Sequence, residues 1–193
     1  VFLAPGNHDF YSAASPYDSV DGTDTVHISR SGEMEAVSLP GLNCTVYGRA
    51  FTAPRQEGSP LAGFRAEGKG LHLGCLHGDT ASNSTYGPIT REEIAGCGLD
   101  YLALGHIHQY SGLQRSGETF WAYPGCPEGR GFDELGEKGV LYLEAEPGHI
   151  SAQFVPLCRR RYQILTADLT GAADPLSAIL AALPEETGED IFR

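Results

Sequence analysis

The stretch YLALGHIHQY, residues 101–110, places an apolar run directly before two histidines that are separated by a single residue. In an extended chain, residues i and i+2 point to the same side, so His106 and His108 can be directed at one spot. Imidazole is the commonest metal ligand in proteins and a frequent general acid or base. A surface loop with two solvated histidines would show the same letters, so the meaning of this stretch depends on which other segments lie near it.

The same pattern, an apolar strand followed by a residue able to bind metal, occurs twice more. Residues 1–6 (VFLAPG) lead into Asn7 and His8, and residues 71–76 (LHLGCL) lead into His77. Strand ends at one edge of a sheet lie near one another, so we expect these side chains to converge. An amide oxygen with neutral imidazole nitrogens suits Mn, Fe or Zn better than Ca or Mg. Three histidines lack this context and are expected to have ordinary strand or turn roles: His27, His72 and His149.

Short apolar segments separated by Gly, Pro and polar residues predict a chain of many strands and few helices. Residues 89–98 are expected to form a helix, because Thr90 and Glu93 have the spacing of a capping box. A hairpin is expected to turn at Pro147-Gly148. Further strands are expected at 26–29, 35–39, 44–51, 71–76, 101–104, 110–114, 119–123 and 159–169, and a second helix at 174–183. This alternation predicts an α/β (α+β-like) fold with a β-sandwich core.

Length and composition favour one domain, or one domain with a small appendage. The chain has 193 residues, is 41% hydrophobic, and carries a formal charge of −12 from 25 acidic and 13 basic residues. That charge argues against a free-standing DNA-coating protein, but not against a nuclease that holds phosphate through metals and a local basic patch. Five scattered cysteines without a CxxC pair favour reduced thiols and a cytoplasmic location, and no apolar stretch is of membrane-spanning length.

Taken together, the three polar motifs resemble a known family. GNHD (6–9), HGD (77–79) and GHIH (105–108) resemble the motifs of the calcineurin-like metallophosphoesterase superfamily. YLALGHIH, with YPGCPEGRGFDELGEKGV (123–140) downstream, further resembles the SbcD-type DNA repair exonucleases. The resemblance covers roughly residues 1–157, and the downstream stretch is the less specific part of it.

The resemblance implies a centre with two divalent metal ions, Mn²⁺ in the first place and Fe²⁺ or Zn²⁺ as alternatives. Asn7, His77 and His106 would hold one metal, and His108 would hold the other. His8, backed by Asp9, would contact the phosphate and stabilise or protonate the leaving oxygen. A hydroxide activated by the two metals would attack phosphorus, because metal binding lowers the pKa of water.

The sequence also departs from the family pattern. No Asp-x-His precedes Asn7, and the family's Gly-Asp-x-x-Asp motif is absent from the chain. Both would lie before Val1, so the chain is expected to be a fragment with low activity of its own. Residues 1–157 would form a core that lacks its N-terminal part, and residues 158–193 would begin a small capping domain.

Three functions remain open on this sequence. The first is a DNA repair exo/endonuclease, and the second is a phosphoesterase that acts on nucleotides or phosphoproteins. The third is a non-catalytic module that binds DNA ends or a partner. The family resemblance adds a coiled-coil ATPase of the SbcC type and a homodimer as partners. The residues expected to face DNA are Phe10, Tyr11, Arg159, Arg160 and Arg161, although the arginine run could equally be a solvated strand edge.

Overall fold

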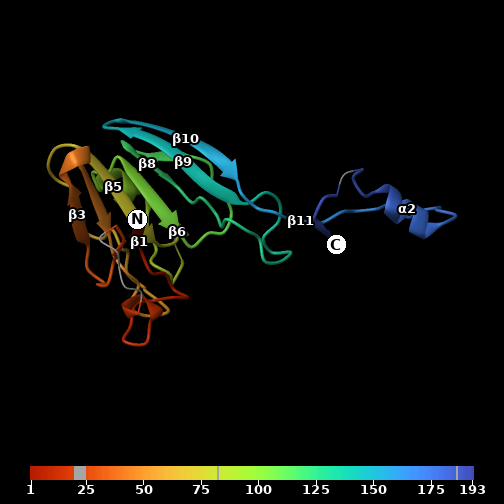
Figure 1. Cartoon of the computed structure of the whole chain (residues 1–193), viewed down its shortest axis with the longest axis horizontal. Helices are drawn as coiled ribbons and strands as arrows, with labels where there is room; N and C mark the ends of the chain where they lie inside the picture. The colour runs from red at the N-terminus through yellow and green to blue at the C-terminus, as the bar shows by residue number, and fades with distance from the viewer. Residues whose placement is uncertain (20–24, 82, 186) are drawn as a thin grey trace.

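A computed structural model describes residues 1–19, 25–81, 83–185 and 187–193 of the chain. A mixed sheet of six strands lies at its centre, in the order β3-β4-β5-β6-β8-β7 (Figure 1). Its strands are β3 (Glu35–Leu39), β4 (Cys44–Gly48), β5 (Leu71–His77), β6 (Tyr101–Gly105), β7 (Gln114–Ser116) and β8 (Thr119–Ala122). Most of these strands begin within a residue or two of the positions expected from the apolar segments.

The four inner strands run parallel, and this places their carboxyl ends at one edge. β4 pairs with β5, β5 with β6, and β6 with β8, all in parallel, whereas β3 and β7 are antiparallel to their neighbours. In the register of β5 and β6, His77 is the partner of Gly105. The residues that follow β6 therefore begin beside the last residue of β5.

Burial of apolar side chains holds these strand ends in place. Leu102 and Leu104 of β6 are almost completely buried, and Leu76 of β5 packs in the same cluster. Helix α1 (Arg91–Gly96) adds Ile94 to that cluster. The helix begins with the predicted capping box, in which the side chains and backbones of Thr90 and Glu93 exchange hydrogen bonds of 3.1 and 2.8 Å. The expected helix and its cap are therefore confirmed.

Three further pairs of strands accompany the main sheet. β1 (Phe2–Leu3) pairs in parallel with β2 (His27–Ile28), and β9 (Gly139–Glu146) forms the predicted hairpin with β10 (His149–Pro156). The ring of Phe154 in β10 stacks on Tyr110 with centroids 4.9 Å apart, which attaches the hairpin beside the central sheet. The described residues thus form a sheet-dominated α/β fold, and the predicted sandwich is not confirmed by this pairing. Two short 3-10 turns complete this part, η1 (Pro16–Asp18) and η2 (Pro40–Leu42).

The segment after residue 160 extends away from the main sheet (Figure 1). It contains β11 (Tyr162–Gln163), α2 (Pro175–Ala181) and β12 (Ile191–Phe192). The strand expected over 159–169 is reduced to two residues, because its partner β12 offers only a two-residue ladder. Likewise, 110–114 is mostly irregular, and β7 begins only at Gln114. The proposed domain boundary near residue 157 stays a prediction.

None of the helices formed by the described residues combines the length and apolar character that crossing a lipid bilayer requires. The three histidines that were expected to have ordinary roles all lie in strands: His27 in β2, His72 in β5 and His149 in β10. His27 contacts Glu35 at 3.1 Å, and the buried His72 lies 3.3 Å from the hydroxyl of Tyr47. His149 opens β10.

Candidate metal centre

An open cavity of ≈ 530 Å³ lies where β5 and β6 end. Three segments that are far apart in the sequence meet there: the loop after β1, the end of β5 and the loop after β6. These three segments contribute all four residues expected to bind metal and both residues given a catalytic role, and the loop between β8 and β9 adds one arginine. The lining is Asn7, His8, Asp9, His77, His106, His108 and Arg130.

Asn7, His77 and His106 form the most compact part of this lining. Nε2 of His77 lies 2.8 Å from Oδ1 of Asn7, and the rings of His77 and His106 have centroids 5.2 Å apart. Two ligand atoms about 2.1 Å from one ion, at a right angle, would themselves be about 3 Å apart. The separation of Asn7 Oδ1 and His77 Nε2 therefore fits joint coordination of one metal.

The backbone is adapted to bring these side chains together. A Cβ atom on Gly6 would lie only 2.4 Å from the ring of His77, so only glycine leaves room for that ring. His106 has a φ of 114°, a region that residues with a side chain seldom occupy. Strained backbone of this kind costs energy and occurs preferentially at functional sites.

Burial keeps the two central imidazoles uncharged. Burial and, to a lesser extent, the neighbouring His106 lower the pKa of His77 to about 4. Burial also lowers the pKa of His106, against the opposing effect of Asp79. Both rings are therefore neutral near pH 7 and offer lone pairs. A neutral set of nitrogen and amide oxygen donors fits a divalent transition metal.

Asp79 is a member of the site that the sequence analysis left without a role. Its Oδ2 lies 3.6 Å from Nε2 of His106, and both side chains are largely buried. The signal was present, since Asp79 is the third residue of the HGD motif. A carboxylate beside a metal-binding histidine is a common arrangement, so Asp79 is a candidate partner of His106.

His8 and Asp9 both line the cavity, but the structure pairs Asp9 with other groups. Oδ1 of Asp9 accepts a hydrogen bond of 2.8 Å from the backbone of Gly6, and Oδ2 accepts one from the Tyr17 hydroxyl. Burial and these contacts with Asp9 raise the pKa of Tyr17 to about 12. Asp9 therefore fixes its own loop, and its expected support of His8 stays a prediction.

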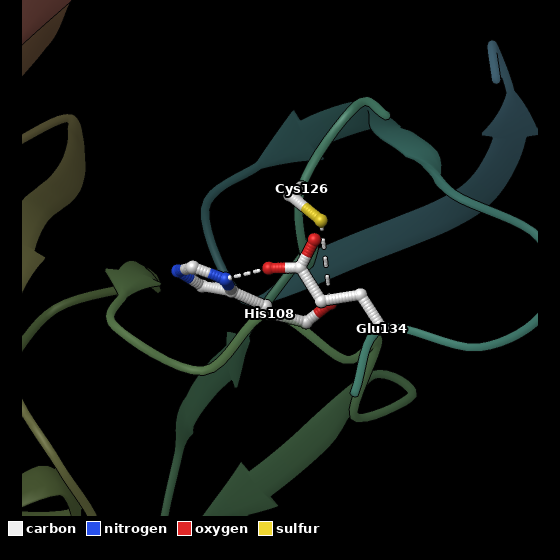
Figure 2. A group of neighbouring side chains, drawn as sticks. All are labelled: His108, Cys126 and Glu134. Carbon is white, nitrogen blue, oxygen red and sulfur yellow. Dashed lines mark hydrogen bonds and ion pairs between the residues drawn. The ribbon is translucent and has the colours of Figure 1, made fainter. Parts of the chain in front are cut away.

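His108 stands at the rim of the cavity and is held by a different part of the chain. Its Nδ1 lies 2.5 Å from Oε1 of Glu134, as Figure 2 shows. Cys126 lies on the other side of this carboxylate, and one ligand atom from each of the three residues falls within 4.8 Å of the others. His108, Cys126 and Glu134 are thus a second group able to hold a metal. Cys126 and Glu134 lie within residues 123–140, the stretch that resembles the SbcD-type exonucleases, but the sequence analysis gave neither of them a role.

The residues expected to face DNA do not join the described lining of the cavity. The backbone of Tyr11 donates a 2.8 Å hydrogen bond to Phe51, which fixes the loop that also carries Phe10. The three arginines instead form ion pairs: Arg159 with Glu189 at 2.7 Å, Arg160 with Glu128 at 3.6 Å, and Arg161 with Asp190 at 2.5 Å. The arginine that does reach the cavity is Arg130, which lies in the loop between β8 and β9.

Comparison with known proteins places this site in context. No family model matches the chain. The chain is 29% identical, over 161 residues, to a curated Bacillus subtilis (strain 168) protein named "Uncharacterized metallophosphoesterase YhaO". The matched region covers 80% of this chain and 39% of that protein, so the chain spans well under half of the relative's length. This similarity to a metallophosphoesterase supports the resemblance to the calcineurin-like metallophosphoesterase superfamily that the sequence motifs indicated.

Proposed function

We propose that this chain carries part of the active centre of an SbcD-type nuclease, which hydrolyses phosphodiester bonds in DNA. The observation that carries the proposal is the convergence of Asn7, His77, His106 and His108 on one cavity that also contains an arginine. The motifs GNHD, HGD and GHIH supply every lining residue that is named for this cavity except Arg130. The nuclease assignment itself rests on the resemblance of residues 101–108 and 123–140 to that family.

Two divalent metals, Mn²⁺ in the first place, would supply an activated hydroxide and neutralise charge on the phosphate. Asn7, His77 and His106 would hold one metal, because their donor atoms are neutral and closely spaced. His108 would present its free nitrogen to the other. Asp79 would keep His106 in its ligating orientation through the 3.6 Å contact.

His8 would act on the substrate, since it lines the cavity from an exposed position. A donor at this place can stabilise or protonate the leaving oxygen as the phosphorus–oxygen bond breaks. Arg130 adds a fixed positive charge to the same cavity, and its side chain is 78% exposed and thus accessible to a phosphate. An arginine fork suits two phosphate oxygens better than a lysine does.

The experiment compares three substrates with the full-length protein and Mn²⁺: linear double-stranded DNA, bis(p-nitrophenyl) phosphate, and the monoester p-nitrophenyl phosphate. A nuclease should cleave DNA and the diester and act weakly on the monoester. His106→Ala serves as the control for contaminating activity. Fast turnover of monoesters or nucleotides without DNA cleavage would assign the site to a phosphoesterase, and DNA binding without turnover would assign it to a binding module.

A further inference from the structure

His108 differs from the other histidines of the cavity in what holds it. The side chain is 45% exposed, so packing against the sheet does not fix its ring. The ring is held instead through Nδ1, which lies 2.5 Å from Oε1 of Glu134. In Figure 2 the other ring nitrogen points away from Glu134. The orientation of His108 therefore depends on a residue 26 positions later in the chain.

Glu134 is itself firmly placed. Its side chain is only 7% exposed, and its second oxygen accepts a 2.7 Å hydrogen bond from the backbone of Arg130. The backbone of Glu134 donates a 3.0 Å bond to Gly131, which closes a turn under the carboxylate. With hydrogen bonds from His108 and from the backbone of Arg130 at its two oxygens, the side chain acts as a carboxylate, which only accepts hydrogen bonds.

The same loop also holds the backbone of His108. The ammonium of Lys138, which is 2% exposed, donates 3.0 Å hydrogen bonds to the carbonyl of His108 and to Oε1 of Gln109. A Cβ atom on Gly125 would lie 3.1 Å from that same carbonyl, so the two loops are in close contact. Residues 125–138 thus hold both the ring and the backbone of His108 in place.

We infer that Glu134 is a positioning residue, which keeps His108 protonated at Nδ1 and leaves the lone pair of Nε2 free for a divalent transition metal. A carboxylate partner requires a donor at Nδ1, and the neutral ring then has its lone pair at Nε2. Partners of this kind fix the tautomer and orientation of metal-binding histidines. The part of this inference that concerns the metal rests on the proposed function. The tautomer of His108, in contrast, can be measured in the protein without metal.

The geometry favours this role over direct coordination by Glu134 and Cys126. Both carboxylate oxygens already accept hydrogen bonds, from His108 and from the backbone of Arg130. Sγ of Cys126 lies 3.7 Å from the carbonyl of His108, as a donor.

The first measurement needs no metal. Long-range ¹⁵N–¹H NMR spectra report which nitrogen of a histidine carries the proton, and His108→Ala identifies the signals of this ring. We expect an Nδ1–H tautomer in the wild-type 193-residue chain and a shift toward Nε2–H or a mixture in Glu134→Ala. Glu134→Gln should give an intermediate result, since its amide oxygen still accepts. Glu128→Gln, which removes a loop carboxylate paired with Arg160 instead, should leave His108 unchanged.

The second measurement is a Co²⁺ titration of the same variants in the full-length protein, followed by visible absorption. Loss of such a partner lowers metal affinity by about 10–100-fold, so we expect that loss in Glu134→Ala and none in Glu128→Gln. An unchanged Nδ1–H tautomer in folded Glu134→Ala overturns the inference. A thiolate-to-cobalt absorption band that is present in the wild type and disappears in Cys126→Ser also overturns the inference, because Cys126 would then bind the metal directly. If no variant binds Co²⁺ while the tautomer shifts as expected, the positioning role stands and the proposed metal centre fails.

Discussion

Two groups of side chains that can carry positive charge lie in this molecule, and they differ in their partners. At the cavity, His77 and His106 are drawn together by the ends of β5 and β6, with burial keeping them neutral. In the C-terminal segment, Arg159, Arg160 and Arg161 each face an acidic side chain. The first group keeps its donor atoms available to a ligand, whereas the charge of the second is used within the chain. Residue type alone does not distinguish these two situations.

The largest effect is expected from the centre of the cavity. His106→Ala in the full-length protein should remove a metal ligand, so metal content and phosphodiesterase rate should fall together. The fall in rate should exceed the roughly 10⁴-fold that losing a single acid–base group can cause. Metal content by mass spectrometry and the rate with bis(p-nitrophenyl) phosphate check this. Full occupancy and rate in this variant would remove His106 from the metal site.

His8→Ala should separate the rate of hydrolysis from the metal content. His8 is placed against the substrate, so kcat should fall by about 10²–10⁴-fold while the metal content stays near that of the wild type. The same two assays on both histidine variants give the comparison directly. If the His8 variant loses its metals as His106→Ala does, the division of roles within the cavity is wrong.

Arg130 and Arg159 test whether position in the cavity decides which arginine reaches DNA. Arg130 lines the cavity and lies 3.7 Å from Glu134, whereas Arg159 lies outside that lining and donates a 2.7 Å hydrogen bond to Glu189. Arg130→Ala should raise the KM for DNA by about tenfold, the scale of one charge-assisted hydrogen bond, with a smaller effect on kcat. Arg159→Ala should change KM less than threefold, because exposed ion pairs contribute little and its charge already faces Glu189. Arg130→Lys controls for charge alone. Equal effects of the two alanine variants would show that lining the cavity does not decide which arginine reaches DNA.

The smallest effect is expected at the pair of Arg161 and Asp190. The hydrogen bonds from Arg161 lower the pKa of Asp190, so this carboxylate stabilises the pairing of β11 with β12 above the ordinary aspartate range. That contribution is lost as the pH falls through the lowered pKa. Amide hydrogen exchange at Gln163 and Ile191 should therefore accelerate only in strong acid. Asp190→Asn should exchange faster at neutral pH and show no such acid step.

Much of the fold could be predicted because it depends on local patterns. The apolar segments at β3, β5 and β6 are read directly from residue order, and the capping box at α1 depends on a three-residue spacing. The length of the strand expected over 159–169 could not be predicted from residue order, because strand length depends on the strand with which it pairs. That partner, β12, lies about thirty residues later and is two residues long.

The sequence by itself indicated which groups come together at the cavity, because each of them follows an apolar strand. His77, His106 and His108 lie where the parallel strands β5 and β6 end at one edge of the sheet, whereas Asn7 and His8 come from the loop after β1, which pairs with β2 outside that sheet. Only the tertiary structure decided what orients and neutralises them. Glu134 reaches His108, Asp79 reaches His106, and the arginine run meets its acids, through contacts between residues distant in the chain. Hydrogen bonds and ion pairs act over a few ångströms and have no periodicity along the chain, so residue order does not reveal them.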